Sequence, residues 1–206
     1  MQSSKFTVNS DAERMAAARY ATEDFAGKLE LDRHSALRLD LLVEETLGMV
    51  KAMVDEFYGQ LWFVGEGTAC ELHLEATTNM DADKKDELLS VSSTGRNAAA
   101  KGFMGLIGEI ISGALRGFGR AMDAYGAETV KYGIVHTQSL TANAADDMVP
   151  IWTLQTYRSD LDNDKDADSE AWDELENSIV AKLADDVIVG IKNDRIEMVI
   201  VKDFGK

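Results

Sequence analysis

The sequence predicts an α+β fold, and three patterns lead to that prediction. Apolar residues recur about every 3.6 residues over two N-terminal segments, 10–26 and 34–58, which is typical of helices. Residues 70–76 alternate between apolar and polar side chains, as in a strand with one buried face. Near the C-terminus, residues 187–191 and 195–201 flank a short polar turn and are expected to form a hairpin.

The first helix is predicted to begin at Ser10, after an edge strand at Lys5–Val8. Ser10 and Glu13 have the spacing of a capping box, in which each side chain satisfies a backbone amide at the start of a helix. Gly27 is expected to end this helix. Its apolar positions are Met15, Ala18, Ala21 and Phe25.

The second helix is expected to run from about His34 to Tyr58, before Gly59, and it carries apolar residues on two sides. Leu37 and Leu41 form the smaller patch. A helix that is apolar on two sides is usually sandwiched inside a core, so both patches are expected to be buried. The main stripe consists of Leu39, Leu42, Val43, Thr46, Val50, Met53 and Phe57.

A first hairpin is predicted to follow, with strands at 60–64 and 70–76 joined by a turn at residues 65–67. Cys70 lies on the apolar face of the second strand, where a buried and unreactive thiol is expected. The opposite face is polar and is expected to be exposed to solvent; it carries Glu71, His73 and Glu75.

The middle of the chain has weaker patterns. Residues 81–91 are typical of a helix, and residues 92–105 form a glycine-rich stretch that is expected to lead into another helix. Residues 117–149 have mixed patterns and are a candidate for a mobile insertion. Because the chain contains one proline and no linker-like stretch, residues 1–206 are expected to form a single domain.

The C-terminal third predicts a strand at 151–157 and a helix at 169–184 before the last hairpin. The acidic run at 160–170 resembles a calcium-binding loop, but it lacks the central glycine and the closing glutamate of an EF-hand. We therefore expect a solvated acidic loop that leads into the N-terminus of the following helix. The apolar stripe of that helix is Trp172, Leu175, Ile179 and Leu183.

Charge and composition limit the kind of partner. The chain has 37 acidic residues against 21 Lys and Arg, a net charge of −16. Such a surface repels nucleic acid and anionic membranes, whereas it allows a basic protein partner. The chain has a single cysteine, which suits a reducing compartment. It has no apolar signal core and no apolar run long enough to cross a bilayer, so we expect a cytoplasmic protein. The three histidines, His34, His73 and His136, lie on separate predicted elements, so no metal site is expected.

The order of these elements resembles a known family. A core helix containing Val43–Gly48 leads into a hairpin, the second strand continues into residues 76–81, and a glycine-rich stretch follows at 100–105. Over about residues 5–111 this order is similar to the histidine-kinase-like (GHKL) ATPases, in particular the bacterial anti-sigma-factor serine kinases. The resemblance implies a two-layer α/β sandwich with a mixed, mostly antiparallel sheet.

The resemblance also implies site residues. Glu44 corresponds to the glutamate that acts as the catalytic base, but Gly48 stands where the family has an asparagine that holds Mg²⁺. Thr78 and Asn79 stand where an Asp-x-Gly motif contacts the adenine, and both the aspartate and the glycine are missing. The residues corresponding to the phosphate-binding glycine box are Lys101, Gly102 and Gly105.

The missing groups predict weak nucleotide binding. A lost hydrogen bond to the base costs about 1–3 kcal/mol, and loss of the Mg²⁺ anchor costs at least as much. Together these losses weaken affinity by about 10²–10⁴-fold. We therefore expect no cofactor, or weakly bound ATP and Mg²⁺.

The function expected from the resemblance is that of a regulatory protein of anti-sigma-factor type, which acts by binding a protein rather than by catalysis. Its partner would be a sigma factor or an antagonist of one, and a homodimer is compatible with this function. One alternative is an active ATP-dependent serine kinase, with Glu44 as the base and the amides near Gly102 and Gly105 holding phosphate. A second alternative is a structural or assembly protein that retains only the scaffold.

Overall fold

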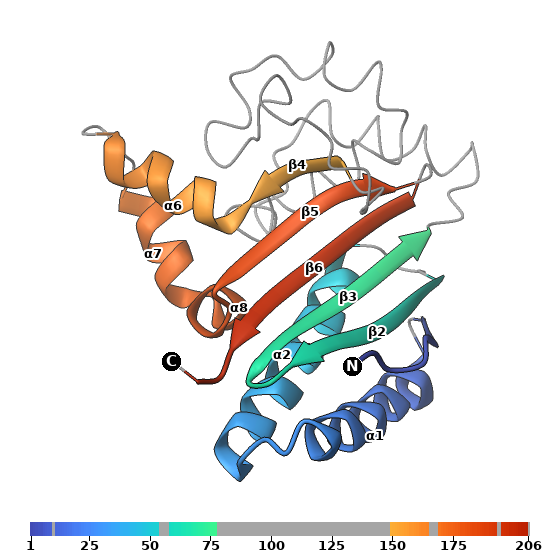
Figure 1. Cartoon of the computed structure of the whole chain (residues 1–206). Helices are drawn as coiled ribbons and strands as arrows, with labels where there is room; N and C mark the ends of the chain where they lie inside the picture. Colours follow the sequence, from blue (N-terminus) through green and yellow to red (C-terminus); the bar gives the residue numbers. More distant parts are fainter. Residues whose placement is uncertain (10, 54–57, 78–148, 165–168, 193–194, 206) are drawn as a thin grey trace, which may run out of the picture.

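The computed structural model describes residues 1–9, 11–53, 58–77, 149–164, 169–192 and 195–205. These residues form one open antiparallel sheet of six strands with helices packed against it, which confirms the α+β class (Figure 1). The predicted helices at 81–91 and after residue 105, and the candidate insertion at 117–149 except its last residue, lie outside the described residues. In the described part of the chain, no helix is long and apolar enough to cross a membrane.

The sheet places two distant hairpins side by side. Its strand order is β1-β2-β3-β6-β5-β4, and every described neighbouring pair is antiparallel. The two predicted hairpins, β2–β3 and β5–β6, are confirmed, and they meet along β3 and β6, where Leu72 lies opposite Ile200. The strands are β1 (Phe6–Asn9), β2 (Tyr58–Glu66), β3 (Ala69–Thr77), β4 (Val149–Thr153), β5 (Asp186–Lys192) and β6 (Arg195–Asp203).

The first hairpin turn is shorter than the sequence predicts. The predicted turn at 65–67 overlaps β2, which continues to Glu66, and β3 begins at Ala69. The chain reverses at Gly67 and Thr68, and Gly67 has φ +60°, a left-handed conformation that a glycine adopts without steric cost.

Helix α1 (Ala12–Lys28) begins at a different cap from the predicted one. The side chain of Asp11 accepts a hydrogen bond from the amide of Glu13, and the predicted cap Ser10 lies outside the described residues. Gly27 does not end the helix as predicted, because its carbonyl still accepts a hydrogen bond from the amide of Glu30. Glu30, with φ 55°, then turns the chain toward the next helix.

Asp32 precedes helix α2 (Arg33–Met53), and its carboxylate accepts hydrogen bonds from the amides of His34 and Ser35 and from the hydroxyl of Ser35. These bonds, led by the amide of Ser35, lower the pKa of Asp32 below its usual value. At the other end the predicted helix is too long, because Tyr58 and Gly59 belong to β2.

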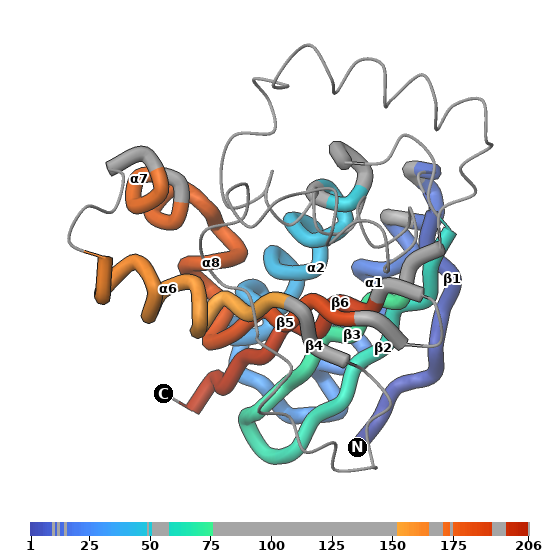
Figure 2. The backbone as a smooth tube through the Cα atoms, turned by 90° about the horizontal axis from the view of Figure 1, so that it is seen from above, coloured from blue at the N-terminus to red at the C-terminus, as the bar shows by residue number. Residues whose placement is uncertain are grey.

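The core lies between the helices and one face of the sheet (Figure 2). The main stripe of α2 is buried at each position whose side chain is described, as predicted, and Phe25 of α1 stacks on Phe63 of β2 at 4.9 Å between ring centroids. The smaller patch is not buried: Leu37 is 60% exposed and Leu41 is 37% exposed. Helix α2 therefore packs against the sheet with one side, and its opposite side is exposed to solvent.

The predicted strand at 151–157 ends early. Thr153 accepts a hydrogen bond from the amide of Thr156 at 3.0 Å and so caps helix α6 (Leu154–Asn163). Tyr157 is therefore helical and buried, with its ring 5.9 Å from that of Trp152. The start of the predicted acidic loop, residues 160–163, also belongs to α6.

The predicted helix at 169–184 is two helices, α7 (Ser169–Asn177) and α8 (Ile179–Leu183). Ser178 separates them, because its hydroxyl accepts a hydrogen bond from the amide of Ala181 and starts a new helix. The break moves Ile179 out of the predicted buried stripe, and its side chain is exposed.

Candidate functional site

Glu44 is the one predicted site residue that the structure describes. The other five, Thr78, Asn79, Lys101, Gly102 and Gly105, lie outside the described residues. Glu44 is exposed on α2, and it lines a cavity of about 150 Å³ between α1 and α2. Buried Val43 and Leu47 form the floor of this cavity, and exposed Ala16 and Arg19 line it from α1.

The edge of this cavity carries an excess of negative charge. Arg19 donates to Asp40, with its Nη2 at 3.0 Å and its Nε at 3.4 Å from the two carboxylate oxygens. The hydrogen bond with Asp40 and the charge of that carboxylate raise the pKa of Arg19, and the carboxylates of Glu44 and Glu23 add to the effect. Asp40 pairs with the guanidinium group, and the charges of Glu44 and Glu23 also act on it, so these four groups together carry a net negative charge that favours a further cation.

Gly48 lies one helical turn after Glu44, where the resemblance requires the Mg²⁺-binding asparagine. It is exposed, and apart from its chain neighbours and the nearby backbone of its own helix, no atom lies within 4 Å of the position that a Cβ would occupy. Glu44 therefore has no metal-ligating side chain beside it at this position. Across the described segments, no group of three or more His, Cys, Asp or Glu side chains could hold a metal ion.

A second polar cluster lies on the opposite face of the sheet, where the sequence predicts exposed side chains. His73 of β3 is only 9% exposed. Its Nδ1 lies 3.0 Å from a carboxylate oxygen of Glu197 on β6, and its Nε2 lies 3.0 Å from a carboxylate oxygen of Glu71. Glu197 is also buried, at 2% exposed. Because His73 itself is buried, the prediction that it points into solvent is wrong.

Aromatic contacts extend this cluster across the sheet. The ring of Trp62 on β2 stacks on His73, with centroids 4.9 Å apart and planes 15° from parallel. The Nζ of Lys5 lies 3.8 Å from the centroid of the Trp62 ring and 3.5 Å from a carboxylate oxygen of Glu75. The polar face thus carries an ordered network over β2, β3 and β6, with Lys5 joining it from just before β1. We call this network the His73 cluster; it consists of Lys5, Trp62, Glu71, His73, Glu75 and Glu197.

Each ring nitrogen of His73 faces a carboxylate oxygen, so each contact needs a hydrogen atom to be a hydrogen bond. An ionised carboxylate only accepts hydrogen bonds, and a neutral imidazole has one N–H. Both contacts of His73 are therefore hydrogen bonds only when the ring is an imidazolium or when one carboxyl group carries the proton. The two contacts hold the ring in one orientation.

A sequence signal for the His73 cluster exists at Glu197. Residues 198–201 are four consecutive apolar residues, which is typical of a strand that is buried on both faces. A glutamate that begins such a run is expected to be buried and to need a partner. The identity of that partner, 124 residues away, is not readable from the pattern.

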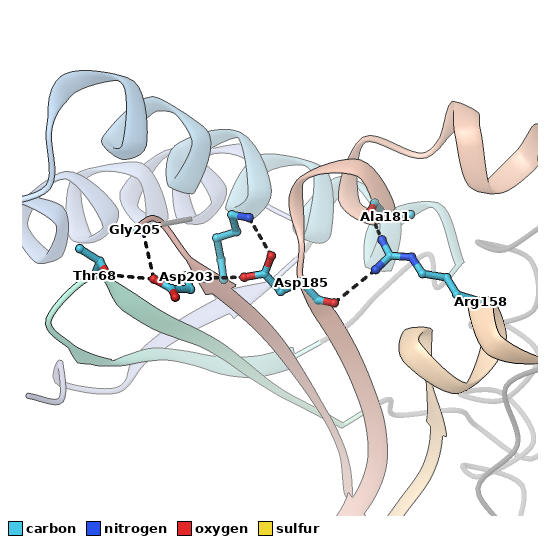
Figure 3. A network of polar contacts seen from close by, with 7 residues as sticks. Thr68, Arg158, Ala181, Asp185, Asp203 and Gly205 are labelled. Carbon is cyan, nitrogen blue, oxygen red and sulfur yellow. Dashed lines mark hydrogen bonds and ion pairs between the residues drawn. The ribbon is translucent and has the colours of Figure 1, made fainter.

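A third network is structural (Figure 3). Asp185 accepts hydrogen bonds from the Nζ of Lys202 at 2.9 Å and from the amide of Asp203 at 2.6 Å. Asp203 in turn accepts from the hydroxyl of Thr68 at 2.8 Å, which ties the first hairpin turn to the end of β6. Arg158 of α6 donates to the carbonyls of Ala181 and Asp185. These contacts fasten strand and helix ends together.

Cys70 is buried, as predicted. Burial raises the pKa of its thiol to about 12, with a smaller contribution from the charge of Glu71. Because the thiolate is the reactive form, this cysteine is chemically inert at neutral pH.

Comparison of the chain with protein-family models, with curated proteins and with solved structures found no match.

Proposed function

We propose that the chain is a cytoplasmic regulatory protein of anti-sigma-factor type, with a histidine-kinase-like fold, that acts by binding a protein. The observation that carries the proposal is the outer side of α1 and α2. Three large apolar side chains are exposed there: Tyr20 at 74%, Leu37 at 60% and Leu41 at 37%. Leu37 and Leu41 lie one turn apart on α2, and neighbouring exposed apolar groups mark interaction surfaces more often than isolated ones do.

Charge supports a basic partner for this surface. Residues 11–53, which form α1 and α2 with the connection between them, contain nine carboxylates against six Lys and Arg side chains. Complementary charge chiefly accelerates association and excludes acidic competitors. A basic sigma factor or an antagonist with a basic surface fits this charge.

The surroundings of Glu44 support weak nucleotide binding. Glycine at position 48 supplies no side-chain oxygen to Mg²⁺, and Mg²⁺ neutralises the triphosphate charge that acidic groups repel. The acidic surroundings of Arg19 oppose the binding of a polyanion at this surface. We infer that ATP binds weakly or not at all.

The alternative is an active ATP-dependent serine kinase, and one observation favours it. Glu44 is exposed at the edge of a cavity, where its carboxylate is accessible to a water molecule or a hydroxyl group. In this case the carboxylate would act as the general base.

Two measurements test the proposal. First, about 1 mM Mg-ATP, which saturates any micromolar site, should leave the melting temperature unchanged and should give no phosphate transfer to serine. Saturable binding with phosphate transfer that is lost in Glu44→Ala and retained in Glu45→Ala would establish the kinase instead.

Second, the purified protein should bind at least one member of a panel of sigma factors and their antagonists from the native host. Surface plasmon resonance measures each pair separately. If no member of the panel binds, with or without nucleotide, the proposed regulatory function is wrong.

A further inference from the structure

We propose that the cavity between α1 and α2 is the docking site for an amphipathic basic helix of the partner, which inserts one apolar side chain and places a Lys or Arg beside Glu44. The inference rests on the proposed function and specifies its binding surface. We call this surface the α1–α2 groove; it consists of Ala16, Arg19, Val43, Glu44 and Leu47, with exposed Leu41 on the neighbouring turn of α2.

The size and floor of the groove fit a single apolar side chain. A cavity of about 150 Å³ accommodates a group the size of a benzene ring. Val43 and Leu47 give it an apolar floor. The space is open on one side, so a partner can fill it without separating α1 from α2.

The exposed residues of α2 continue the groove along the helix. Leu37, Leu41 and Glu44 have spacings of four and three residues, so they lie on one side of α2 in successive turns. A helix laid along this side would bury both leucines and reach the groove at Glu44. This is the geometry of amphipathic helices that bind in grooves.

Charge selects a basic helix over an acidic one. The positive charge of Arg19 is matched by its ion pair with Asp40 at 3.0 Å. Glu44 and Glu23 act on the same guanidinium group, so the local charge is negative in sum. A cation of the partner can bind beside Glu44, whereas an acidic helix would be repelled.

The test uses a synthetic peptide in which leucines occupy one side of a helix and lysines the other. Binding is measured by fluorescence anisotropy in about 0.15 M salt, where the Debye length is short. Ala16→Trp fills the groove, and Ala17→Trp adds the same side chain at the next exposed position of α1. We expect Ala16→Trp to weaken binding about tenfold or more, because it excludes the buried leucine, and Ala17→Trp to change it less than about twofold.

A charge variant sharpens the test. Glu44→Gln should weaken binding about two- to fivefold, and the loss should shrink as salt rises, because an exposed ion pair is screened. Glu66→Gln removes the same charge from an exposed position at the end of β2 and should have no such effect. Far-ultraviolet circular dichroism checks that each variant is folded. If Ala16→Trp does not fold, Ala16→Arg replaces it and should also prevent peptide binding.

The outcomes separate the groove from the proposed function. Equal affinities of Ala16→Trp and Ala17→Trp for the peptide, or no saturable binding by the native protein, would overturn the groove. If a sigma factor binds the native protein and Ala16→Trp equally well, the proposed docking site is wrong but the proposed function is retained. Peptide binding that depends on Ala16, without any partner from the sigma-factor panel, would retain the groove and reject the proposed function.

Discussion

The two faces of the sheet are held in place by different physics, although the same strands form both. On β3, the residues that face the helices are Cys70, Leu72 and Leu74, all nearly inaccessible to solvent. The alternate residues include His73, which is almost as well buried but is fixed by two carboxylates and a tryptophan ring. Burial alone therefore does not indicate which kind of interaction stabilises a position.

The difference has energetic consequences. Apolar packing gains free energy in proportion to the area removed from water, and it tolerates changes of side chain that conserve volume. A buried ionic network must first offset the desolvation of its charges, and it fails when one member is removed. We therefore expect the helix-covered face to respond to lost volume and the other face to respond to lost hydrogen bonds.

The largest effect is expected from Phe63→Ala on the helix-covered face. Phe63 is fully buried and stacks on Phe25, so truncation leaves a cavity between α1 and β2. The free energy of unfolding should fall by about 3–5 kcal/mol. Urea unfolding measures it, and Phe63→Leu, which keeps most of the volume, should cost clearly less. Equal losses for the two variants would contradict the volume argument.

A somewhat smaller effect is expected from His73→Phe on the opposite face. Phenylalanine preserves the stack on Trp62 but removes both nitrogen–carboxylate contacts, one of them to buried Glu197. Unfolding free energy should fall by about 2–4 kcal/mol. The exposed His34 provides the control, since His34→Phe should change stability by less than about 0.5 kcal/mol. If His73→Phe proved neutral, the two faces would not differ as described.

At the edge of the same cluster, Lys5→Met should have a modest effect. The ammonium group lies over Trp62 and near Glu75, but the side chain is 44% exposed. We expect a loss of about 0.5–1 kcal/mol that becomes smaller in high salt. Thermal unfolding at two salt concentrations measures both effects. A loss that does not depend on salt would mean that Lys5 contributes through packing alone.

The smallest effect at neutral pH is expected at Cys70. Folding favours the protonated thiol, so its contribution to stability is complete below pH 9 and is lost as the pH rises toward 12. Because the pKa rises from 9.0 to about 12, alkylation by iodoacetamide at pH 8 should be on the order of a thousandfold slower than in unfolded protein. Mass spectrometry gives both rates; comparable rates would show that the thiol is accessible.

Much of the fold follows from local patterns. The main stripe of α2 and the two hairpins were predictable because their periodicity depends on neighbours in sequence. Two of the errors come from single polar side chains within apolar runs. Thr153 and Ser178 each start a helix by accepting one amide hydrogen bond. The spacing of apolar residues does not reveal such a hydrogen bond.

Less of the candidate site was predictable. The sequence places Glu44 on a helix, but its cavity depends on where Ala16 and Arg19 of another helix lie. The exposure of Leu37 likewise depends on which side of α2 the sheet covers. The bond between His73 and Glu197 joins residues 124 positions apart, so a scan of neighbouring positions cannot detect it.

The inaccessible thiol of Cys70 also makes the protein suitable for site-specific spectroscopy. The chain contains a single cysteine, so a second one introduced on an exposed side chain would be the only position that reacts with a maleimide dye. Glu66 at the end of β2 is exposed and lies outside the α1–α2 groove, so it is a suitable place for such a label. Distances from a dye there to a labelled partner could then be measured without removing a native residue from the core.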